Sequence, residues 1–453
     1  MDTVKRRRRG FSATQIIVLG FVLVILAGAI LLHLPISSAA GERTPFLSCL
    51  FTSVSATCVT GLVVLDTATH WSIFGQAVIL FLIQIGGLGF MTMAVLISMM
   101  IRRRISPREC LVLANAYNLT SFEGIVPLIR RILLGTAIIE GAGAFLLSIR
   151  FIPLFGIGEG IWKSVFHAVS AFCNAGFDLM GSFSGKFSSV AFFAEDALVS
   201  GTLMLLIMLG GIGFVVWDDL IALIRKRRRL SVYTALVLSV SGFLWIFGAV
   251  AVALCEWNNP ATLGGLSTGG KILASLFQSV TMRTAGFNTV DLTACGALTQ
   301  TVFLFLMFVG GASGSTAGGV KVATIGIFFA ALKDLALGKK NVTVFRRSVP
   351  FAELTRALTL ICVQFSITVI AAAVLIGCGA DVMPALFEAF SASGTVGLSL
   401  SLTPTLSVLS RITVMLLMYF GRVGILTVTA ALYDQTRGTD CEMRYADAHF
   451  MIG

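Results

Sequence analysis

The chain has 453 residues and a net charge of +11, yet only 12% of its residues are charged and 57% are hydrophobic. Its mean hydropathy of +0.94 lies far above that of soluble domains. This composition excludes an ordinary soluble globular protein and predicts one built into a lipid bilayer.

The amino-terminal segment combines a basic run at residues 5–9 with an apolar stretch at 16–32, which imitates a secretory signal followed by a cleavage site at 38–40. The apolar stretch is too long for the core of a signal peptide. We therefore expect the segment to remain in the mature protein as the first spanning helix.

Uncharged runs long enough to span a bilayer recur along the whole chain. Together with the internal repeat described below, they predict spanning helices at residues 14–34, 73–99, 127–149, 194–223, 231–255, 298–331, 354–378 and 405–433. Between the two members of each pair lies a shorter apolar segment, beginning near residue 46, 161, 271 or 382. A helix of about a dozen residues cannot cross ~30 Å of hydrocarbon, so we expect these four segments to enter the membrane and return.

The basic residues gather in clusters at 5–9, 102–131, 225–229, 333–356 and 437–444. Each cluster follows an even number of predicted spans, as the positive-inside rule requires when both termini are cytoplasmic. Membrane topology therefore accounts for the charge without nucleic acid. Binding of a partner or of anionic membrane lipids by one cluster remains open.

An internal repeat organises the chain. The four short segments share one pattern of apolar and hydroxyl residues, and each is followed by a glycine and a bulky apolar residue. The glycines are Gly61, Gly176, Gly286 and Gly397, about 110 residues apart. We predict an all-α membrane protein of four M1-P-M2 repeats, with eight spanning helices, four re-entrant pore helices and pseudo-fourfold symmetry. The repeat boundaries are 1–104, 105–229, 230–345 with a broken inner helix, and 346–453 with a short cytoplasmic tail.

Glycines at the turning points of four re-entrant loops favour a cation pathway. Irregular backbone at membrane depth is tolerated where it lines a cavity, and glycine lets main-chain carbonyls turn inward to replace the hydration shell of an ion. Close helix packing is the better explanation of any one of these glycines taken singly. Four copies in register favour the pathway.

A second glycine series lies within the later span of each pair, at residues 86–89, 210–213, 310–314 and 421–424. We expect helix packing to explain the first two. The third belongs to a glycine-rich run at 310–319, which no helix tolerates. This run lacks the Gly-Lys-Ser/Thr ending and the preceding strand of a phosphate-binding loop.

Residues 395–397 (Thr-Val-Gly) repeat the first half of the potassium-channel filter string. With the fourfold pattern, the whole chain resembles the superfamily of potassium transporters that includes TrkH, KtrB and the plant HKT proteins. It is most similar to the KtrB branch, the membrane subunit of the Ktr uptake system, because it begins directly with the first repeat. In these families, filter glycines in all four repeats accompany potassium selectivity, and a serine in the first marks sodium-selective relatives.

The resemblance implies a K⁺ site at the filter carbonyls. Its residues are Cys58, Val59, Thr60, Gly61, Cys173, Asn174, Ala175, Gly176, Arg283, Thr284, Ala285, Gly286, Gly394, Thr395, Val396 and Gly397. We expect the Arg283 side chain to point away from the ion path, since an inward guanidinium repels cations.

The resemblance also implies a gate, an intramembrane loop that blocks the cavity below the filter. Its residues are Gly310, Gly311, Gly314, Ser315, Thr316, Gly318 and Gly319, together with the pore-facing Arg422. An ion pair between Arg422 and Glu140 is the structural alternative, because a charge at this depth needs compensation. We expect Lys321, Asp218 and Asp219 to be interfacial.

By the same resemblance, the chain forms a homodimer in the cell (inner) membrane on a cytoplasmic ring of KtrA-type RCK subunits. That ring would bind ATP/ADP or NAD, and this chain would bind no cofactor. A sodium-coupled or sodium-conducting symporter is the alternative. An intramembrane enzyme is not expected, because the spans lack a catalytic set of residues.

Overall fold

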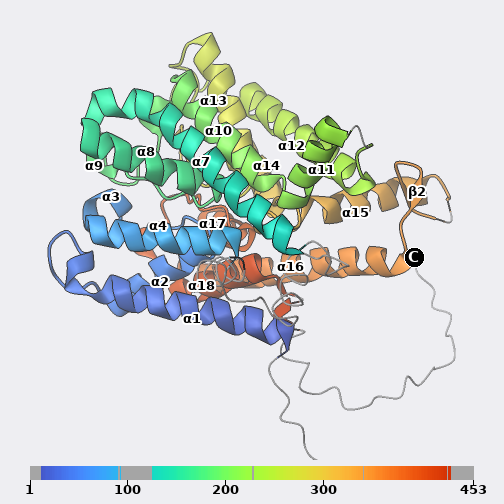
Figure 1. Cartoon of the computed structure of the whole chain (residues 1–453), viewed down its shortest axis with the longest axis horizontal. Coiled ribbons are helices and arrows are strands. Elements are labelled where there is room, and N and C mark those ends of the chain that lie inside the picture. The colour runs from blue at the N-terminus through green and yellow to red at the C-terminus, as the bar shows by residue number, and fades with distance from the viewer. Residues whose placement is uncertain are drawn as a thin grey trace, which may run out of the picture.

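The computed structural model describes residues 12–89, 92, 125–226, 229–339, 341–425 and 427–429. The basic runs at 5–9 and 102–108 and the tail after 429 lie outside the described residues. So does nearly all of the predicted helix 73–99 beyond residue 89. In the described part nearly all regular structure is helical (Figure 1).

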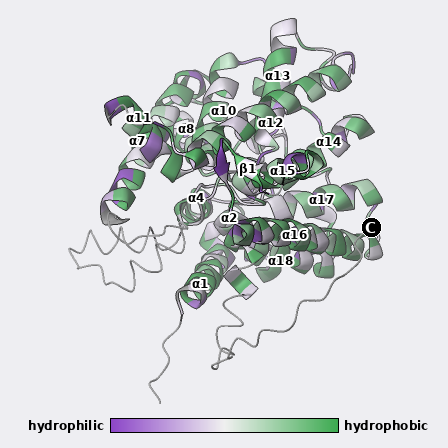
Figure 2. Cartoon of the chain, turned by 90° about the vertical axis from the view of Figure 1, so that its right-hand side faces the viewer, coloured by the Kyte–Doolittle hydropathy of each residue, from purple (hydrophilic) through white to green (hydrophobic). Residues whose placement is uncertain are grey.

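Four long apolar helices have the length of a bilayer crossing. They are α1 (Ala13–His33), α7 (Ile125–Phe155), α12 (Val232–Glu256) and α16 (Phe351–Gly377). The shortest has 21 residues, about 31 Å at 1.5 Å per residue. Figure 2 shows them coloured as hydrophobic over most of their length. These helices confirm the predictions at 14–34, 127–149, 231–255 and 354–378, with α7 extended through Pro153.

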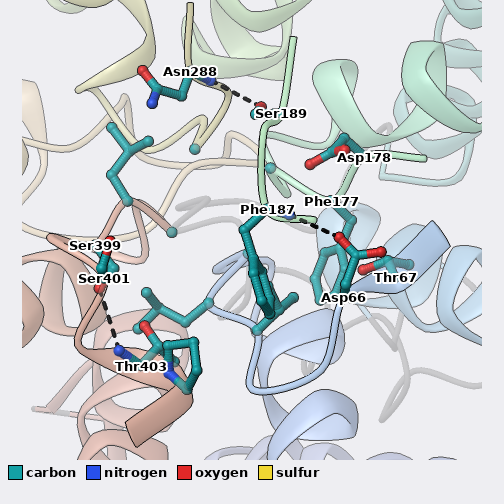
Figure 3. Close-up of a pocket in the computed structure, with 18 of the residues that line it drawn as sticks. Asp66, Thr67, Phe177, Asp178, Phe187, Ser189, Asn288, Ser399, Ser401 and Thr403 are labelled. Atoms are coloured by element: carbon teal, nitrogen blue, oxygen red, sulfur yellow. Dashed lines mark hydrogen bonds between the residues drawn. The ribbon is translucent and has the colours of Figure 1, made fainter. Parts of the chain in front are cut away.

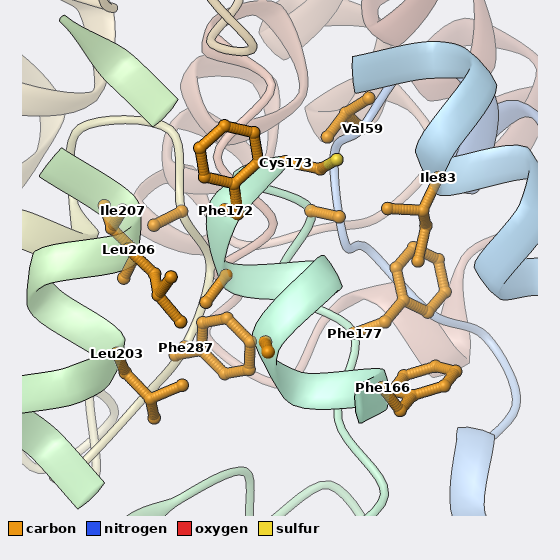
Figure 4. Close-up of a cluster of buried hydrophobic side chains, with 14 of the residues drawn as sticks. Val59, Ile83, Phe166, Phe172, Cys173, Phe177, Leu203, Leu206, Ile207 and Phe287 are labelled. Atoms are coloured by element: carbon orange, nitrogen blue, oxygen red, sulfur yellow. The ribbon is translucent and has the colours of Figure 1, made fainter. Parts of the chain in front are cut away.

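A short helix follows each long one along the chain and packs against it. These are α2 (Phe46–Thr57), α8 (Ile157–Phe172), α13 (Thr268–Thr281) and α17 (Val382–Gly394). They begin within four residues of the predicted positions and have 12 to 16 residues. They are enclosed by other helices, as Figure 4 shows for α8, where Phe166 and Phe172 lie among side chains of the surrounding elements.

The third helix of each set is also short. These helices are α4 (Ile73–Leu88), α10 (Ala197–Gly211), α14 (Ala297–Phe308) and α18 (Val408–Val423). The chain continues after α10 as α11 (Phe214–Lys226) and after α14, beyond the glycine-rich run, as α15 (Val322–Ala336). The prediction of one continuous helix at 194–223 is wrong, because α10 and α11 meet at a bend of 97°.

The helices close into a ring of contacts. Each set of long, short and third helix packs internally, and the third helix of each set also contacts the short helix of the next. The pairs between sets are α4 with α8, α10 with α13, α14 with α17, and α18 with α2. The last pair joins the end of the chain to its beginning, so the four short helices surround one axis.

The connections gather at two ends of the molecule. At one end lie α3 (Thr67–His70) and α9 (Gly181–Ser184), together with the 3₁₀ turns Pro35–Ser37, Ala191–Phe193 and Thr403–Thr405. At the other end, after α15, a hairpin of β1 (Thr343–Val344) and β2 (Arg347–Ser348) pairs Thr343 with Ser348 (Figures 1 and 2).

Candidate ion pathway

The chain leaves each short helix through the same backbone conformation. Two residues before each glycine stands a residue in the left-handed region, namely Val59 (φ 55°), Asn174 (φ 57°), Thr284 (φ 72°) and Thr395 (φ 53°). Gly61, Gly176, Gly286 and Gly397 then have φ of 91°, 68°, 85° and 94°. Three of the four preceding residues are β-branched, and such residues rarely adopt positive φ. Backbone strain of this kind concentrates at functional sites.

Hydroxyl side chains of the short helices hold these segments in place. Ser55 and Ser391 accept hydrogen bonds from the amides of Gly61 and Gly397, both at 3.1 Å. At the equivalent positions of the other two sets, Ser170 donates to the Phe177 carbonyl (2.7 Å) and Thr281 donates to the Phe287 carbonyl (2.6 Å). All four segments are therefore anchored from the same place on the preceding helix.

The four glycines lie around one point. A Cβ atom placed on Gly61 would lie 3.1 Å from the Cα of Gly176; the same construction on Gly176, Gly286 and Gly397 reaches the next glycine of the ring at 2.8, 3.5 and 2.9 Å. Each such Cβ would also collide with the carbonyl oxygen that precedes the next glycine, on Ala175, Ala285, Val396 and Thr60 in turn. Any side chain here would fill the ring.

The chemistry of this ring fits an alkali cation. Four backbone carbonyl groups, from Thr60, Ala175, Ala285 and Val396, stand next to the ring of glycines. Among the described residues, the buried hydroxyls of Thr60 and Thr395 have no hydrogen-bond partner. Neutral oxygens in a water-poor site are the ligands that replace the hydration shell of a potassium-sized ion.

One side of the ring opens into a cavity of about 180 Å³, lined by the four glycines and by residues of the connecting loops. Two carboxylates, Asp66 and Asp178, face it beside Phe187 (Figure 3). Asp66 caps α3 and accepts from the Phe187 amide at 3.0 Å. The pKa of Asp178 is raised to about 6, mainly by burial and to a smaller extent by the charge of Asp66, while the hydrogen bond from the Met180 amide lowers it. Negative charge at this mouth attracts cations.

The third helices all break at a glycine of the second series. α4 ends before Gly89 (φ 82°), α10 before Gly213 (φ 92°) and α18 before Gly424 (φ 87°), and helical hydrogen bonding resumes after each. The first glycine of each of these motifs packs closely on the end of a short helix, so that a Cβ on Gly86, for example, would collide with the Thr57 carbonyl oxygen. The packing prediction for the first two motifs is therefore incomplete, because these glycines also end helices.

The glycine-rich run forms a buried loop, as predicted, between α14 and α15. Its two ends come together at an isolated bridge between Val309 and Val320. A Cβ on Gly318 would collide with the Thr395 side chain, so the loop lies against the segment that follows α17. The carbonyls freed by the break after α10 accept from it, since Gly211 bonds the Ala312 amide (3.0 Å) and Gly210 the Thr316 amide (3.2 Å).

Arg422 links this loop to α4. Its guanidinium donates to the Thr316 carbonyl and to the carbonyls of Gly86 (2.5 Å) and Gly87 (2.9 Å). Glu140, the alternative partner, instead accepts from Gln84 at 3.2 Å and lies 3.9 Å from the Cys173 sulfur. The geometry favours bonding to loop carbonyls over the ion pair.

The remaining charged residues are placed as follows. Arg283 points toward α12 and does not line the cavity at the mouth. Asp218 pairs with Arg131 at an exposed position, and Asp219 accepts hydrogen bonds from the hydroxyls of Ser231 and Thr234 at the start of α12. Lys321 differs from the interfacial prediction, because its ammonium donates to the Ala317 carbonyl of the loop at 2.8 Å.

A bundle of long apolar helices of bilayer-spanning length defines a polytopic membrane protein. The family model for TrkH, a cation transport protein, matches residues 5–435. This chain belongs to that family of cation transport proteins.

Several individual proteins are similar over nearly their whole length. The potassium/sodium uptake protein NtpJ of Enterococcus hirae is 39% identical, covering 99% of both chains. The Ktr system potassium uptake protein B of Bacillus subtilis is 37% identical over 98% of this chain and 97% of its own, and that of Vibrio alginolyticus 36% over 94% and 93%. The crystal structure of the potassium transporter TrkH from Vibrio parahaemolyticus shares the fold, with a TM-score of 0.74 at 17% identity, covering 96% of this chain and 88% of that one.

Proposed function

We propose that this chain conducts potassium into the cell through the ring of Gly61, Gly176, Gly286 and Gly397. The observation that carries the proposal is the closed ring itself, in which four carbonyls and four glycines from distant parts of the sequence meet. The names of the Bacillus and Vibrio relatives, both potassium uptake proteins, agree with it.

The architecture we propose is four M1-P-M2 repeats with pseudo-fourfold symmetry, with boundaries near 104, 229 and 345. The long helices are M1, the short helices are the re-entrant pore helices, and the broken third helices with their continuations are M2. Support comes from the sequence of helix contacts around the molecule: each third helix packs on the short helix of the next set, and the last packs on the first. The four long helices are then unbroken crossings, and the four third helices with their continuations are interrupted crossings, which gives eight spans.

In this proposal the filter consists of the segments 58–61, 173–176, 283–286 and 394–397. Left-handed residues alternate with glycine in each, which lets successive carbonyls face the ion. The preceding helices direct their carboxyl-terminal, partially negative ends toward the same region, and this favours a cation.

The loop at 309–321, held by Arg422, is the proposed gate. It is buried, it lies against Thr395, and it is tied to α10 and α18 by hydrogen bonds. A positive side chain next to the pathway opposes cations as long as the loop stays in place.

We further propose a homodimer in the cell (inner) membrane, with both termini cytoplasmic, seated on a ring of nucleotide-binding subunits. The names of the Bacillus and Vibrio relatives place them in a Ktr system. The basic end of the molecule, with Arg346 and Arg347 in the hairpin after α15, suits contact with such a partner. The nucleotide belongs to that partner, and K⁺ is the transported ion.

A second candidate is a pathway that also carries or couples sodium, and the name of NtpJ, a potassium/sodium uptake protein, favours it. Flux into liposomes containing the purified chain decides between the two. Potassium and rubidium should enter much faster than sodium at one fixed voltage. Equal sodium and potassium rates would refute potassium selectivity, and potassium entry that requires sodium would establish coupling.

A further inference from the structure

Arg283 occupies a position that is small in the other three filter segments. It stands three residues before Gly286, where the other segments have Cys58, Cys173 and Gly394. Of the four segments, only the third has a large, charged side chain at this position. It belongs to the same set of helices as the loop between α14 and α15.

The guanidinium of Arg283 joins two elements. It donates to the carbonyl and hydroxyl oxygens of Ser241 on α12, both at 3.3 Å, and to the Gly310 carbonyl at 2.9 Å. Its carbon lies 5.4 Å from the ring centre of Trp245, also on α12. The residue is only 5% exposed.

Such a placement is costly. Among the described residues no carboxylate forms a salt bridge with Arg283, and its Nε has no hydrogen-bond partner. A buried charge without a counterion is far less favourable than a small neutral residue, which three equivalent positions have. The contact with Gly310 is therefore the feature that distinguishes this segment.

Gly310 is the neck of the loop. α14 ends at Phe308, the Gly310 amide donates to the Val320 carbonyl at 2.9 Å, and a Cβ on Gly310 would collide with the Gly318 carbonyl oxygen. The two ends of the loop are hydrogen-bonded to each other here, so a movement of the loop must also displace Gly310.

We propose that Arg283 couples the third filter segment to the neck of the loop, so that loop position and ion selectivity are energetically linked. Thr284, the left-handed residue of that filter segment, follows Arg283 directly in the chain. Displacement of Gly310 pulls on the guanidinium and hence on the filter backbone, and linkage makes the effect reciprocal. This inference rests on the proposed role of the loop as the gate.

The test is a double-mutant comparison in liposomes with the purified full-length chain. Potassium flux and the ratio of potassium to sodium flux are measured for the unmodified protein, Arg422→Ala, Arg283→Met and the double variant. Arg422→Ala releases the loop and should raise flux in both backgrounds. With Arg283 present, it should also change the flux ratio by about fivefold, a typical effect of coupling between two sites. With Met at 283 the ratio should stay constant within about twofold, the usual limit of additivity.

The outcomes separate the two hypotheses. Equal changes of the ratio in both backgrounds would overturn the coupling and leave the gate intact. No rise of flux in Arg422→Ala would overturn the gate and the coupling with it. If Arg283→Met fails to fold, Arg283→Lys decides by the same comparison, because one ammonium cannot bridge Ser241 and Gly310 as the forked guanidinium does.

Lys271→Met supplies the matched control. Lys271 lies in the same repeat, donates to the Trp257 carbonyl at 2.8 Å and stands 5.2 Å from the Trp257 ring. It reproduces the cation and aromatic pairing of Arg283 without touching the loop. Its removal should leave flux, ratio and the response to Arg422→Ala unchanged, and a change equal to that of Arg283→Met would count against a specific link.

Discussion

The filter segments and the segments at the breaks of the third helices both exist in four copies, but they have diverged to different degrees. The filter segments share one backbone conformation and one kind of hydroxyl anchor. The breaks share only a glycine with positive φ; one leads into a 97° bend, one into a long buried loop and one carries Arg422. In the function we propose, selecting an ion requires equal ligands around it, whereas closing the path requires one element that the other repeats lack.

The largest effect should come from a methyl group in the ring. Gly397→Ala places a side chain at φ 94° against the Thr60 carbonyl. Backbone strain alone costs ~1–3 kcal/mol, so we expect potassium flux to fall at least about tenfold, at 1.4 kcal/mol per factor of ten. Gly41→Ala is the control, because Gly41 has a similar φ of 73° with nothing within 4 Å. Equal flux in the two variants would remove the ring from the pathway.

The next effect should come from releasing the loop. Arg422→Ala removes hydrogen bonds from a charged donor, worth ~1.5–3 kcal/mol each, and we expect potassium flux to rise about tenfold. Arg411→Ala is the control, since Arg411 lies on the same helix and bonds the Leu406 carbonyl at 3.0 Å. Unchanged flux with a lower melting temperature in Arg422→Ala would show that the residue only stabilises the fold.

The equality of the filter segments can be measured directly. Ser55→Ala, Ser170→Ala, Thr281→Val and Ser391→Ala each remove one anchor, and a hydrogen bond of this kind is worth about 1 kcal/mol. We expect each variant to lower the ratio of potassium to sodium flux by about fivefold, in line with that energy. Thr413→Val, an exposed hydroxyl bonded within its own helix, should have no effect. One anchor that far outweighs the other three would contradict the equivalence.

The smallest effect should come from the mouth. Because the pKa of Asp178 is raised to about 6, its charge is present at pH 7 and mostly lost at pH 5. Uptake from dilute potassium should fall roughly two- to threefold over this external pH range, since local cation concentration follows surface charge. Asp178→Asn should give a low uptake that no longer varies with pH. Asp291→Asn is the control, because Asp291 is exposed and lies outside the cavity, and this variant should behave like the unmodified protein. A full pH response in Asp178→Asn would show that another group causes the pH dependence of uptake.

Much of the fold follows from the sequence because the determining signals are local. The long helices coincide with predominantly apolar stretches, and the start of each short helix lies within four residues of its predicted position. The loop between α14 and α15 was also predictable, because consecutive glycines deprive a helix of side-chain packing and of backbone rigidity.

The breaks at Gly89, Gly213 and Gly424 could not be predicted with the same certainty. A single glycine costs a helix only ~1 kcal/mol, and tertiary contacts decide whether the helix continues. The signal lay in the last glycine of each motif, the one with positive φ, rather than in the adjacent pair. The left-handed Val59, Thr284 and Thr395 oppose the preference of their residue types, so only the surrounding packing imposes them.

The loop at 309–321 has a stoichiometric consequence. In an assembly of four identical chains, any segment that approaches the central axis is present four times, and four such loops cannot share the space. In the pathway we propose, all four quarters belong to one polypeptide, so a single quarter can send its backbone onto the axis while the other three make room for it. Covalent connection of the repeats thus permits a one-sided closure around a many-sided site.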